Sequence, residues 1–351
     1  MEATSLHDEA YRADGGPEGD LQRGAPALCL LNEFQHRFPL SHAPFAAVGE
    51  RLGQGEQWVL QTLRVARVRG EISRVGAVFA PGAIGASVLA ALRVPPAELE
   101  RVARLVSRRP EVNHNYEREH AFNLWFVMTA PDALSLNASL RELEGEAGCG
   151  RILELPLLDE YRIDLGFDLS GEFSTAGDST RMQPYRELSP QEKKLVAALQ
   201  PGLELVAHPY AALARCAGVR EEECVASLQS WIDEGTIRRF GVIVRHRELG
   251  FRANAMVVWD VPDALTTALG LRLAHRPGVT LAYRRRRALP EWPYNLYCMV
   301  HGRDRGAVVK RIEELRAECG LIGFASHTLF SRRCFKQRGA RYIEATEAAD
   351  V

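Results

Sequence analysis

The spacing of apolar positions in the second half of the chain is first that of helices and later that of strands. A helical stretch begins at Ser189-Pro190-Gln191-Glu192, where serine suits the N-cap, proline the first helical position and the acid the first turn. A short helix is expected over residues 210–216 and, after a turn at Gly218, another over 221–234 that Gly235 ends. Three short helices in this order predict a helix-turn-helix domain.

The period then changes to the alternation that is typical of strands. The expected strands span residues 240–244, 253–259, 279–284, 294–301 and 323–330, and the expected helices span 264–275 and 305–319. From residue 253 onward the order is β-α-β-β-α-β, which is the order of ferredoxin-like domains. The second half therefore predicts a helix-turn-helix domain followed by a ferredoxin-like domain.

The first half of the chain repeats this plan, and internal repetition changes the fold prediction more than any single motif. Three segments match in the same order and at similar spacing: 70–78 (GEISRVGAV) with 235–243 (GTIRRFGVI), 109–118 with 276–285, and 122–125 with 294–297. The first half is then expected to contain helices within 27–68 and after Pro95 and Pro131, and strands near 87–94, 112–117, 122–129 and 151–157.

The chain is therefore predicted to be α+β, with two tandem units that each join a winged helix-turn-helix domain to a ferredoxin-like βαββαβ domain. The segment SGEFSTAGDSTRMQP (170–184) has the composition of a flexible linker. Because two related sheets in one chain can pair as a homodimer does, we expect a pseudo-dimer, and further homo-dimerisation stays open. The expected boundaries are 1–24 (disordered tail), 25–74 and 187–240 (helix-turn-helix), 75–168 and 241–343 (ferredoxin-like), 169–186 (linker) and 344–351 (tail).

Composition adds a cellular context. The 44 Lys+Arg and 45 Asp+Glu residues give a net charge of -1, so the chain as a whole has no attraction for a polyanion. Seven scattered cysteines without a C-x-x-C pair indicate reduced thiols. The N-terminal segment has no apolar core, and no long apolar run occurs anywhere. We therefore expect a cytoplasmic protein that does not associate with a membrane.

Helix-turn-helix domains commonly place a recognition helix in the major groove of DNA, so a transcription regulator is the first functional alternative. In the second unit that helix would begin with Glu221, Glu222 and Glu223, which would face phosphates. In the first unit the equivalent stretch, 53–61, contains no cation. Both helices are better suited to a structural role than to reading bases.

We accordingly predict that the protein has no specific affinity for DNA. The acidic recognition helix and the net charge of -1 remove the phosphate contacts that dominate DNA affinity. Fluorescence anisotropy with its own upstream region at physiological salt would measure this. Nanomolar, sequence-selective binding would contradict the prediction.

The predicted domain order resembles that of the Lrp/AsnC regulators. Short sequence motifs, however, indicate a relative of these regulators with a different function. VNHNYEREH (112–120) with NLWF (123–126), and DLGFD (164–168), resemble the D-type subunit of siroheme decarboxylases. RRFG (238–241) with Arg245-His246, Tyr283-Arg284-Arg285, WPYNLY (292–297) and His301-Gly302 resemble the L-type partner. The resemblance covers nearly everything after residue 25, so the chain resembles a fused D-L siroheme decarboxylase.

The resemblance implies a carboxy-lyase that converts siroheme to 12,18-didecarboxysiroheme, the step shared by haem d1 biosynthesis and the alternative haem route. It implies no cofactor beyond the iron of the siroheme substrate, and other haem d1 biosynthesis proteins as candidate partners. An Lrp/AsnC-type regulator and a non-catalytic haem sensor remain the alternatives.

Siroheme carries a ring of carboxylates, which arginine is suited to bind because its planar fork donates two parallel hydrogen bonds. Four consecutive cations, Arg284, Arg285, Arg286 and Arg287, follow Tyr283 at the end of an expected strand, with Trp292 close behind. We expect these six residues to bind substrate. The alternative interpretation is a solvated run of charge.

Decarboxylation also needs an acid that supplies a proton to carbon. His114, Tyr116, Arg118 and His120 should share one face if the strand continues, because side chains alternate with period two. His114, Tyr116 and His120 are therefore candidate catalytic groups, and Arg118 a candidate carboxylate ligand.

His246 follows a strand beside Arg245. As a neutral imidazole it is a candidate ligand to the substrate's iron as well as a catalytic candidate, while Arg245 is a candidate substrate contact. Asn123 and Asn295 recur at matching repeat positions. They are weaker candidates for substrate binding, because repetition is equally expected of residues that pack the sheet.

Overall fold

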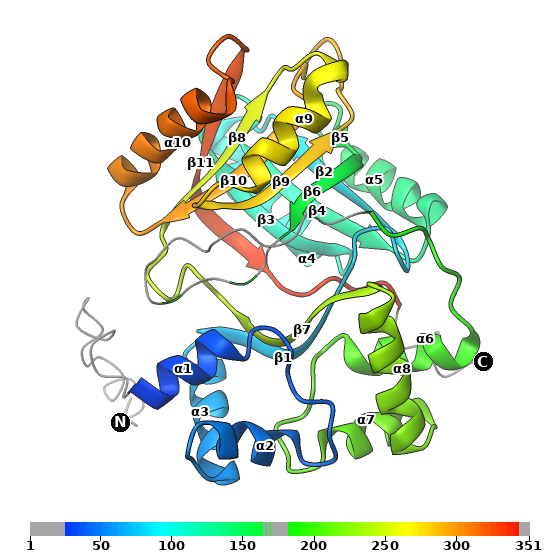
Figure 1. Cartoon of the computed structure of the whole chain (residues 1–351). Coiled ribbons are helices and arrows are strands. Elements are labelled where there is room, and N and C mark those ends of the chain that lie inside the picture. Colours follow the sequence, from blue (N-terminus) through cyan, green and yellow to red (C-terminus); the bar gives the residue numbers. More distant parts are fainter. Residues whose placement is uncertain (1–24, 164–165, 167–168, 170–181, 344–351) are drawn as a thin grey trace, which may run out of the picture.

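The computed structural model describes residues 25–163, 166, 169 and 182–343. The predicted tails and most of the predicted linker lie outside these residues. The elements are, in chain order (Figure 1), α1 (Ala25–Glu33), α2 (Pro44–Arg51), α3 (Glu56–Val68), β1 (Ile72–Phe79), β2 (Ala86–Leu92), η2 (Pro96–Glu98), α4 (Leu99–Arg108), β3 (Val112–Arg118), β4 (Leu124–Ala130), α5 (Ala133–Ala147), β5 (Leu153–Leu155), β6 (Leu157–Ile163), α6 (Pro190–Leu199), α7 (Pro209–Ala217), α8 (Glu221–Asp233), β7 (Ile237–Val244), β8 (Ala253–Trp259), α9 (Asp263–Ala274), β9 (Val279–Arg285), β10 (Leu296–Gly302), α10 (Arg305–Cys319) and β11 (Ser326–Gln337).

The two helix-turn-helix domains share one hydrophobic core and one antiparallel ribbon, β1 with β7, which lies between the helices and the large sheet (Figure 1). Gly76 pairs with Gly241, and both occupy the same position of the repeat, so the pseudo-twofold axis passes through this pair. A Cβ on Gly241 would overlap the carbonyl oxygen of Phe34, to which Val242 N–H donates at 2.8 Å. Glycine is required here by close approach of the chain.

The remaining strands form a nine-stranded sheet in the order β5-β2-β4-β3-β11-β8-β10-β9-β6. Each unit supplies a ferredoxin-like group of four, and the groups meet where β3 pairs with β11 and where β9 pairs with β6. The two end strands, β5 and β6, are separated only by Pro156. The sheet therefore closes on itself, which leaves no long exposed edge.

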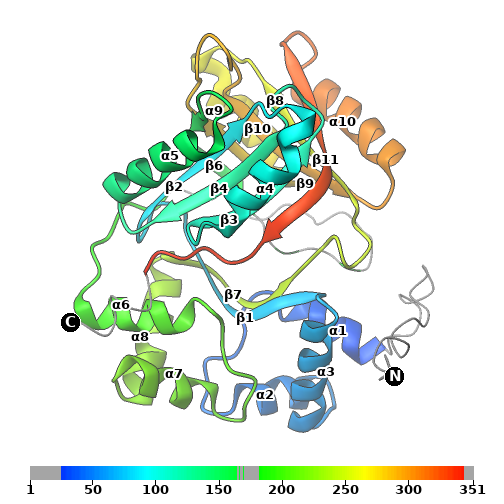
Figure 2. The ribbon, with the colours of Figure 1, turned by 180° about the vertical axis from the view of Figure 1, so that it is seen from behind.

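Closure places the two groups of strands face to face. Helices α9 and α10 cover one outer face and α4 and α5 the other, as the two opposite views show (Figures 1 and 2). Between the inner faces lies a core to which both units contribute, including Trp125 of the first and Met256, Val258 and Tyr297 of the second. In the described part of the chain no helix has both the length and the apolar character needed to cross a membrane.

The predicted pairing of the two sheets is confirmed, but β6 and the C-terminal part of β11, which make the pairs, were not predicted. The expected strand 151–157 is shorter, and β6 follows it. The expected strand 323–330 continues as β11 to Gln337. The boundaries expected at 74/75 and 240/241 fall inside β1 and β7.

Candidate active site

A cavity of about 380 Å³ lies between the closed sheet and the β1–β7 ribbon. Its walls come from the ribbon, from the inward faces of β3 and β9 with their neighbours, and from the segment 337–342 that follows β11. Both units thus contribute to one space, as expected from the pseudo-twofold axis. The fold needs both halves to build it.

The cavity wall is rich in guanidinium groups. No aspartate or glutamate is among the described residues that line it. Such a wall favours a ligand with several negative charges, because the described charged groups that line it are all cations. The lining arginines are Arg74, Arg118, Arg238, Arg239, Arg245, Arg285 and Arg338.

Two of these arginines are held in the same way by the two units. Arg118 Nη1 donates to the carbonyl of Leu329 (3.0 Å), and its guanidinium lies 5.6 Å from the ring centroid of Tyr116. Arg285 Nη1 donates to the carbonyl of Leu155 (2.7 Å), and its guanidinium lies 4.7 Å from the Tyr283 ring. Each arginine is thereby oriented by one carbonyl and one aromatic face, which leaves further N–H groups for a ligand.

The ribbon adds Arg74, whose Nη2 donates to the carbonyl of Ala77 (2.8 Å) and whose pKa burial lowers to about 10. Arg238, also on the ribbon, forms an ion pair of 3.1 Å with buried Glu160 on β6. That pair joins the ribbon to the sheet. Arg74 and Arg239 occupy the same position of the repeat, and this is the signal by which these missed arginines could have been found.

Three imidazoles line the same cavity. Burial and the charge of Arg74 lower the pKa of His114 to about 4. Burial, followed by His114 and Arg247, lowers the pKa of His246 to about 4. Burial also holds the pKa of His301 well below its usual range. All three are therefore neutral at pH 7 in the ligand-free protein, and His301 was not among the predicted site residues.

Seven predicted site residues line the cavity: His114, Tyr116, Arg118, Arg245, His246, Tyr283 and Arg285. Burial raises the pKa of Tyr116, so its phenol stays protonated and can donate a hydrogen bond. The other predicted residues lie elsewhere.

His120 does not share the face of His114, because β3 ends at Arg118 and the strand period ends with it. Its Nδ1 accepts a hydrogen bond from Phe122 N–H (3.0 Å), and its ring centroid lies 5.3 Å from that of Trp292. The expected four-residue face is therefore corrected to His114, Tyr116 and Arg118.

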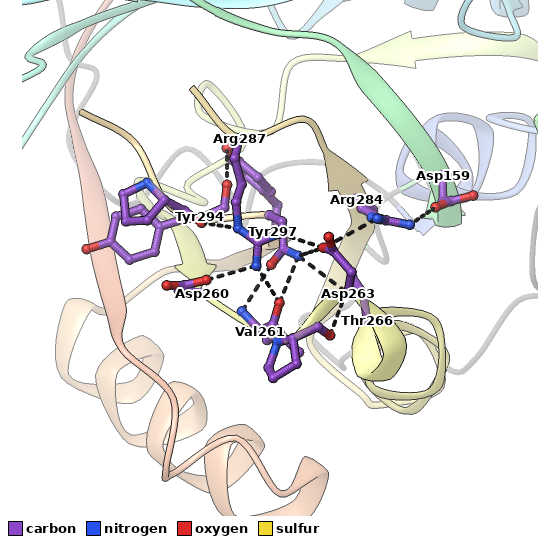
Figure 3. Close-up of polar contacts among 12 residues, drawn as sticks. Asp159, Asp260, Val261, Asp263, Thr266, Arg284, Arg287, Tyr294 and Tyr297 are labelled. Carbon is purple, nitrogen blue, oxygen red and sulfur yellow. Dashed lines mark hydrogen bonds and ion pairs between the residues drawn. The ribbon is translucent and has the colours of Figure 1, made fainter. Parts of the chain in front are cut away.

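The arginine run is divided between two roles, and only Arg285 reaches the cavity. Arg287 binds Asp260 (2.9 Å), Asp263 and the carbonyls of Val261 and Pro293 (Figure 3). Arg284 binds Asp159 and Asp263, both at 3.3 Å. Arg286 is outside the lining, and its N–H donates to the carbonyl of Pro156.

The remaining candidates, Trp292, Asn123 and Asn295, lie outside the cavity lining. Trp292 is fully buried and donates from Nε1 to the Tyr297 hydroxyl (2.7 Å). Asn123 exchanges hydrogen bonds with both backbone groups of Val94, and Asn295 does the same with Val261. The repeated asparagines therefore fasten equivalent loops, and neither lines the cavity.

Acidification is expected to destabilise the fold. The pKa values of His114 and His246 are about 4 in the folded chain, against 6.5 for an ordinary histidine. Between pH 4 and pH 6.5 the unfolded chain therefore binds more protons than the folded chain. The free energy of unfolding should fall as the pH drops through this window, by about 1 to 2 kcal/mol per imidazole from pH 6.5 to 5. Urea unfolding at both pH values measures the difference. His275→Gln, at an exposed histidine outside the cavity, should preserve it, and equal stabilities of the unaltered chain would contradict the prediction.

Two helix-turn-helix domains, two ferredoxin-like domains and one shared cavity lined by cations define a fused, pseudo-dimeric protein with a site suited to an anionic ligand. A family model described as AsnC-like ligand binding domain matches residues 83–162 and 248–336. A second, described as Siroheme decarboxylase NirDL-like HTH domain, matches residues 29–72 and 192–238.

The chain is 43% identical over 317 residues to the siroheme decarboxylase NirDL subunit of Paracoccus denitrificans (strain Pd 1222), covering 90% of this chain and 97% of the relative. A crystal structure of the siroheme decarboxylase NirDL matches with a TM-score of 0.68 at 26% identity, covering 92% of this chain and 96% of that one. Another, of NirDL in complex with an iron-uroporphyrin III analogue, matches with a TM-score of 0.66 at 26% identity, covering 92% and 95%.

The chain belongs to the NirDL-type siroheme decarboxylases. It is a carboxy-lyase that acts on siroheme, and the predicted family and fold class are confirmed.

Proposed function

We propose that siroheme binds in the arginine-lined cavity and is converted there to 12,18-didecarboxysiroheme. The observation that carries this proposal is the combination of lining arginines from both units with no lining carboxylate among the described residues. A macrocycle that bears many carboxylates supplies the missing anions. The related NirDL structure with an iron-uroporphyrin III analogue supports the same kind of ligand.

His114 is the group that we assign to proton transfer. Cleavage of the bond between the methylene carbon and the carboxylate carbon releases CO₂ and leaves the electron pair on the methylene carbon, which must take a proton to become a methyl group. The carboxylates of a bound substrate favour the imidazolium form of His114, so the imidazole takes up a proton on binding and then donates it to the carbon. Tyr116 and Arg118, on the same face of β3, orient the reacting carboxylate.

His246 is the candidate ligand to the substrate's iron, because a neutral imidazole is the form that binds iron. Arg245, Tyr283 and Arg285 then contact the substrate from the second unit. No further cofactor is proposed. The product would serve haem d1 biosynthesis or the alternative haem route in the cytoplasm, with other haem d1 biosynthesis proteins as partners.

Anaerobic incubation of the full chain with siroheme, followed by chromatography and mass spectrometry of the pigment, tests the proposal. Loss of two carboxyl groups is expected without added cofactor. A pigment that binds but keeps all its carboxyl groups would instead indicate the haem-sensor alternative, and a pigment that does not bind would remove the cavity from consideration.

A further inference from the structure

A connected row of polar side chains crosses three neighbouring strands of the second unit. Asn254 on β8, His301 on β10 and Thr280 on β9 all line the cavity, and Asn254 and His301 are directly paired residues of adjacent strands. The first unit has a polar row at the same positions, Ser87, Thr129 and Asn113, in which Thr129 Oγ1 donates to Asn113 Oδ1 (3.2 Å). That row contains no imidazole, so the two pseudo-symmetric walls differ in the histidine at the centre of the row.

The direction of every hydrogen bond in this row follows from Arg118. An arginine only donates, and Arg118 Nη1 lies 3.5 Å from Asn254 Oδ1, so the amide oxygen faces Arg118 and the amide nitrogen faces the histidines. Asn254 Nδ2 lies 2.8 Å from His301 Nε2 and 3.5 Å from His246 Nε2. Both Nε2 atoms must therefore accept, and both imidazoles carry their proton on Nδ1.

The far end of the row agrees with this direction. His301 Nδ1–H donates a hydrogen bond to Thr280 Oγ1 (2.9 Å). The Thr280 hydroxyl in turn donates to the carbonyl of Met299 (3.3 Å). Donors and acceptors alternate without conflict from Arg118 to the backbone of β10. Reversing any member would set two donors or two acceptors against each other.

We propose that Thr280, His301 and Asn254 form a positioning relay that fixes the tautomer and orientation of His246 in the decarboxylation site. The relay directs Nε2 of His246 toward Asn254 and leaves Nδ1–H as a donor to a substrate carboxylate. Coordination of the substrate's iron would require the ring to release Asn254 and bind through Nε2, or to lose the Nδ1 proton. None of the three relay residues transfers a proton. This inference rests on siroheme binding in the cavity, but its structural core concerns the ligand-free protein.

The surroundings explain why such a relay is useful. The charged and titratable groups that face His246 and His301 include His114 and Arg118 from β3 and Arg247, which follows β7. These groups, together with burial, oppose protonation of the two imidazoles. Hydrogen bonds from a neutral network are then what defines the ring orientation.

Thr280→Val, compared with Thr280→Ser, tests the relay. Valine keeps the shape but removes the acceptor for His301 Nδ1–H, whereas serine retains the hydroxyl. In ligand-free protein labelled with ¹⁵N-histidine, NMR should show His301 as the Nδ1-protonated tautomer in the unaltered chain and in Thr280→Ser, and a changed tautomer in Thr280→Val. The rate of single-turnover decarboxylation should fall about five- to tenfold only in Thr280→Val, the scale of one lost hydrogen bond, while siroheme affinity is retained.

Thr266→Val is the matched control, because it removes a buried threonine hydroxyl of the same unit that donates to the carbonyl of Pro262 and lies outside the cavity. It should change neither the His301 signal nor the rate. An unchanged His301 tautomer in Thr280→Val would overturn the relay, whatever the activity. An altered tautomer with unaltered siroheme turnover would overturn its functional part.

Asn254→Asp provides an independent test if Thr280→Val does not fold. A carboxylate between the two imidazoles favours their protonated forms, so the pKa values of His246 and His301 should rise. The pH profile of single-turnover decarboxylation should move upward by about one unit, and at pH 5 the ¹⁵N signals should report a larger imidazolium fraction than in the unaltered chain. A profile and spectrum identical to those of the unaltered chain would refute the relay.

Discussion

Replacement of His114 by alanine is expected to lower the turnover of siroheme by at least about a hundredfold, the usual lower scale for removing a general acid. His114 lies on β3 where the first unit lines the cavity, with Tyr116 and Arg118 on the same face. Its position in the other copy of the repeat is occupied by Leu281, which can neither donate a proton nor bind iron. The two walls are therefore chemically unequal, and the first should carry the proton transfer.

Pigment products measured under anaerobic single-turnover conditions separate this loss from a loss of binding. His120→Ala is the matched control, because that histidine follows the same strand but packs against Trp292 outside the cavity. It should keep most of the activity. Leu281→His should likewise change little, because the proton donor on the other wall, His114, is still present. Didecarboxysiroheme formed by His114→Ala at the unaltered rate would remove His114 from the mechanism and make His246 the next candidate.

Much of the fold could be predicted because the information is local and is written twice. The capped helix at Ser189 is confirmed in detail, since Ser189 accepts from Glu192 N–H and the Glu192 carboxylate accepts from Ser189 N–H. The matching segments 70–78 and 235–243 correspond to β1 and β7, the two strands of the ribbon. Local patterns and repetition are sufficient for such elements.

The strands that join the two units could not be predicted in the same way. β6 and the second half of β11 pair with the edge strands of the opposite unit, Tyr283 facing Glu160 and Tyr116 facing Cys334. Residues 331–337 read SRRCFKQ and show no clean alternation of apolar and polar side chains. Their strand conformation is imposed by a distant partner, because edge backbone groups need hydrogen bonds whatever the side chains are.

The same limit explains the site. The alternation of side chains along a strand correctly predicts that His114, Tyr116 and Arg118 share one face. It does not apply to His120, because β3 ends at Arg118. A run of arginines has no local signal that separates ligand-binding members from neutralised ones. The acids that neutralise Arg284 and Arg287 come from β6 and from the segment around α9, far away in sequence.

Arg285→Ala is expected to weaken siroheme binding by about 1.5–3 kcal/mol, which is roughly a ten- to 150-fold rise in the dissociation constant. Of the four consecutive arginines, Arg285 lines the cavity, where its guanidinium is oriented by the Leu155 carbonyl and the Tyr283 ring. Its Nε has no hydrogen-bond partner among the described residues, so a substrate carboxylate would satisfy a buried donor.

Arg287→Ala supplies the comparison that makes the result specific. Arg287 donates to Asp260, to Asp263 and to two backbone carbonyls, and its hydrogen bond lowers the pKa of Asp263 (Figure 3). Its removal leaves those carboxylates and carbonyls without their donor, so the free energy of unfolding should fall by about 1 to 3 kcal/mol. Siroheme affinity should stay within about twofold. Absorbance titration with siroheme and urea unfolding of both variants measure the two quantities. If Arg285→Ala leaves the titration curve unchanged, or if Arg287→Ala weakens binding as much, the division of the arginine run into one substrate contact and one structural clamp is wrong.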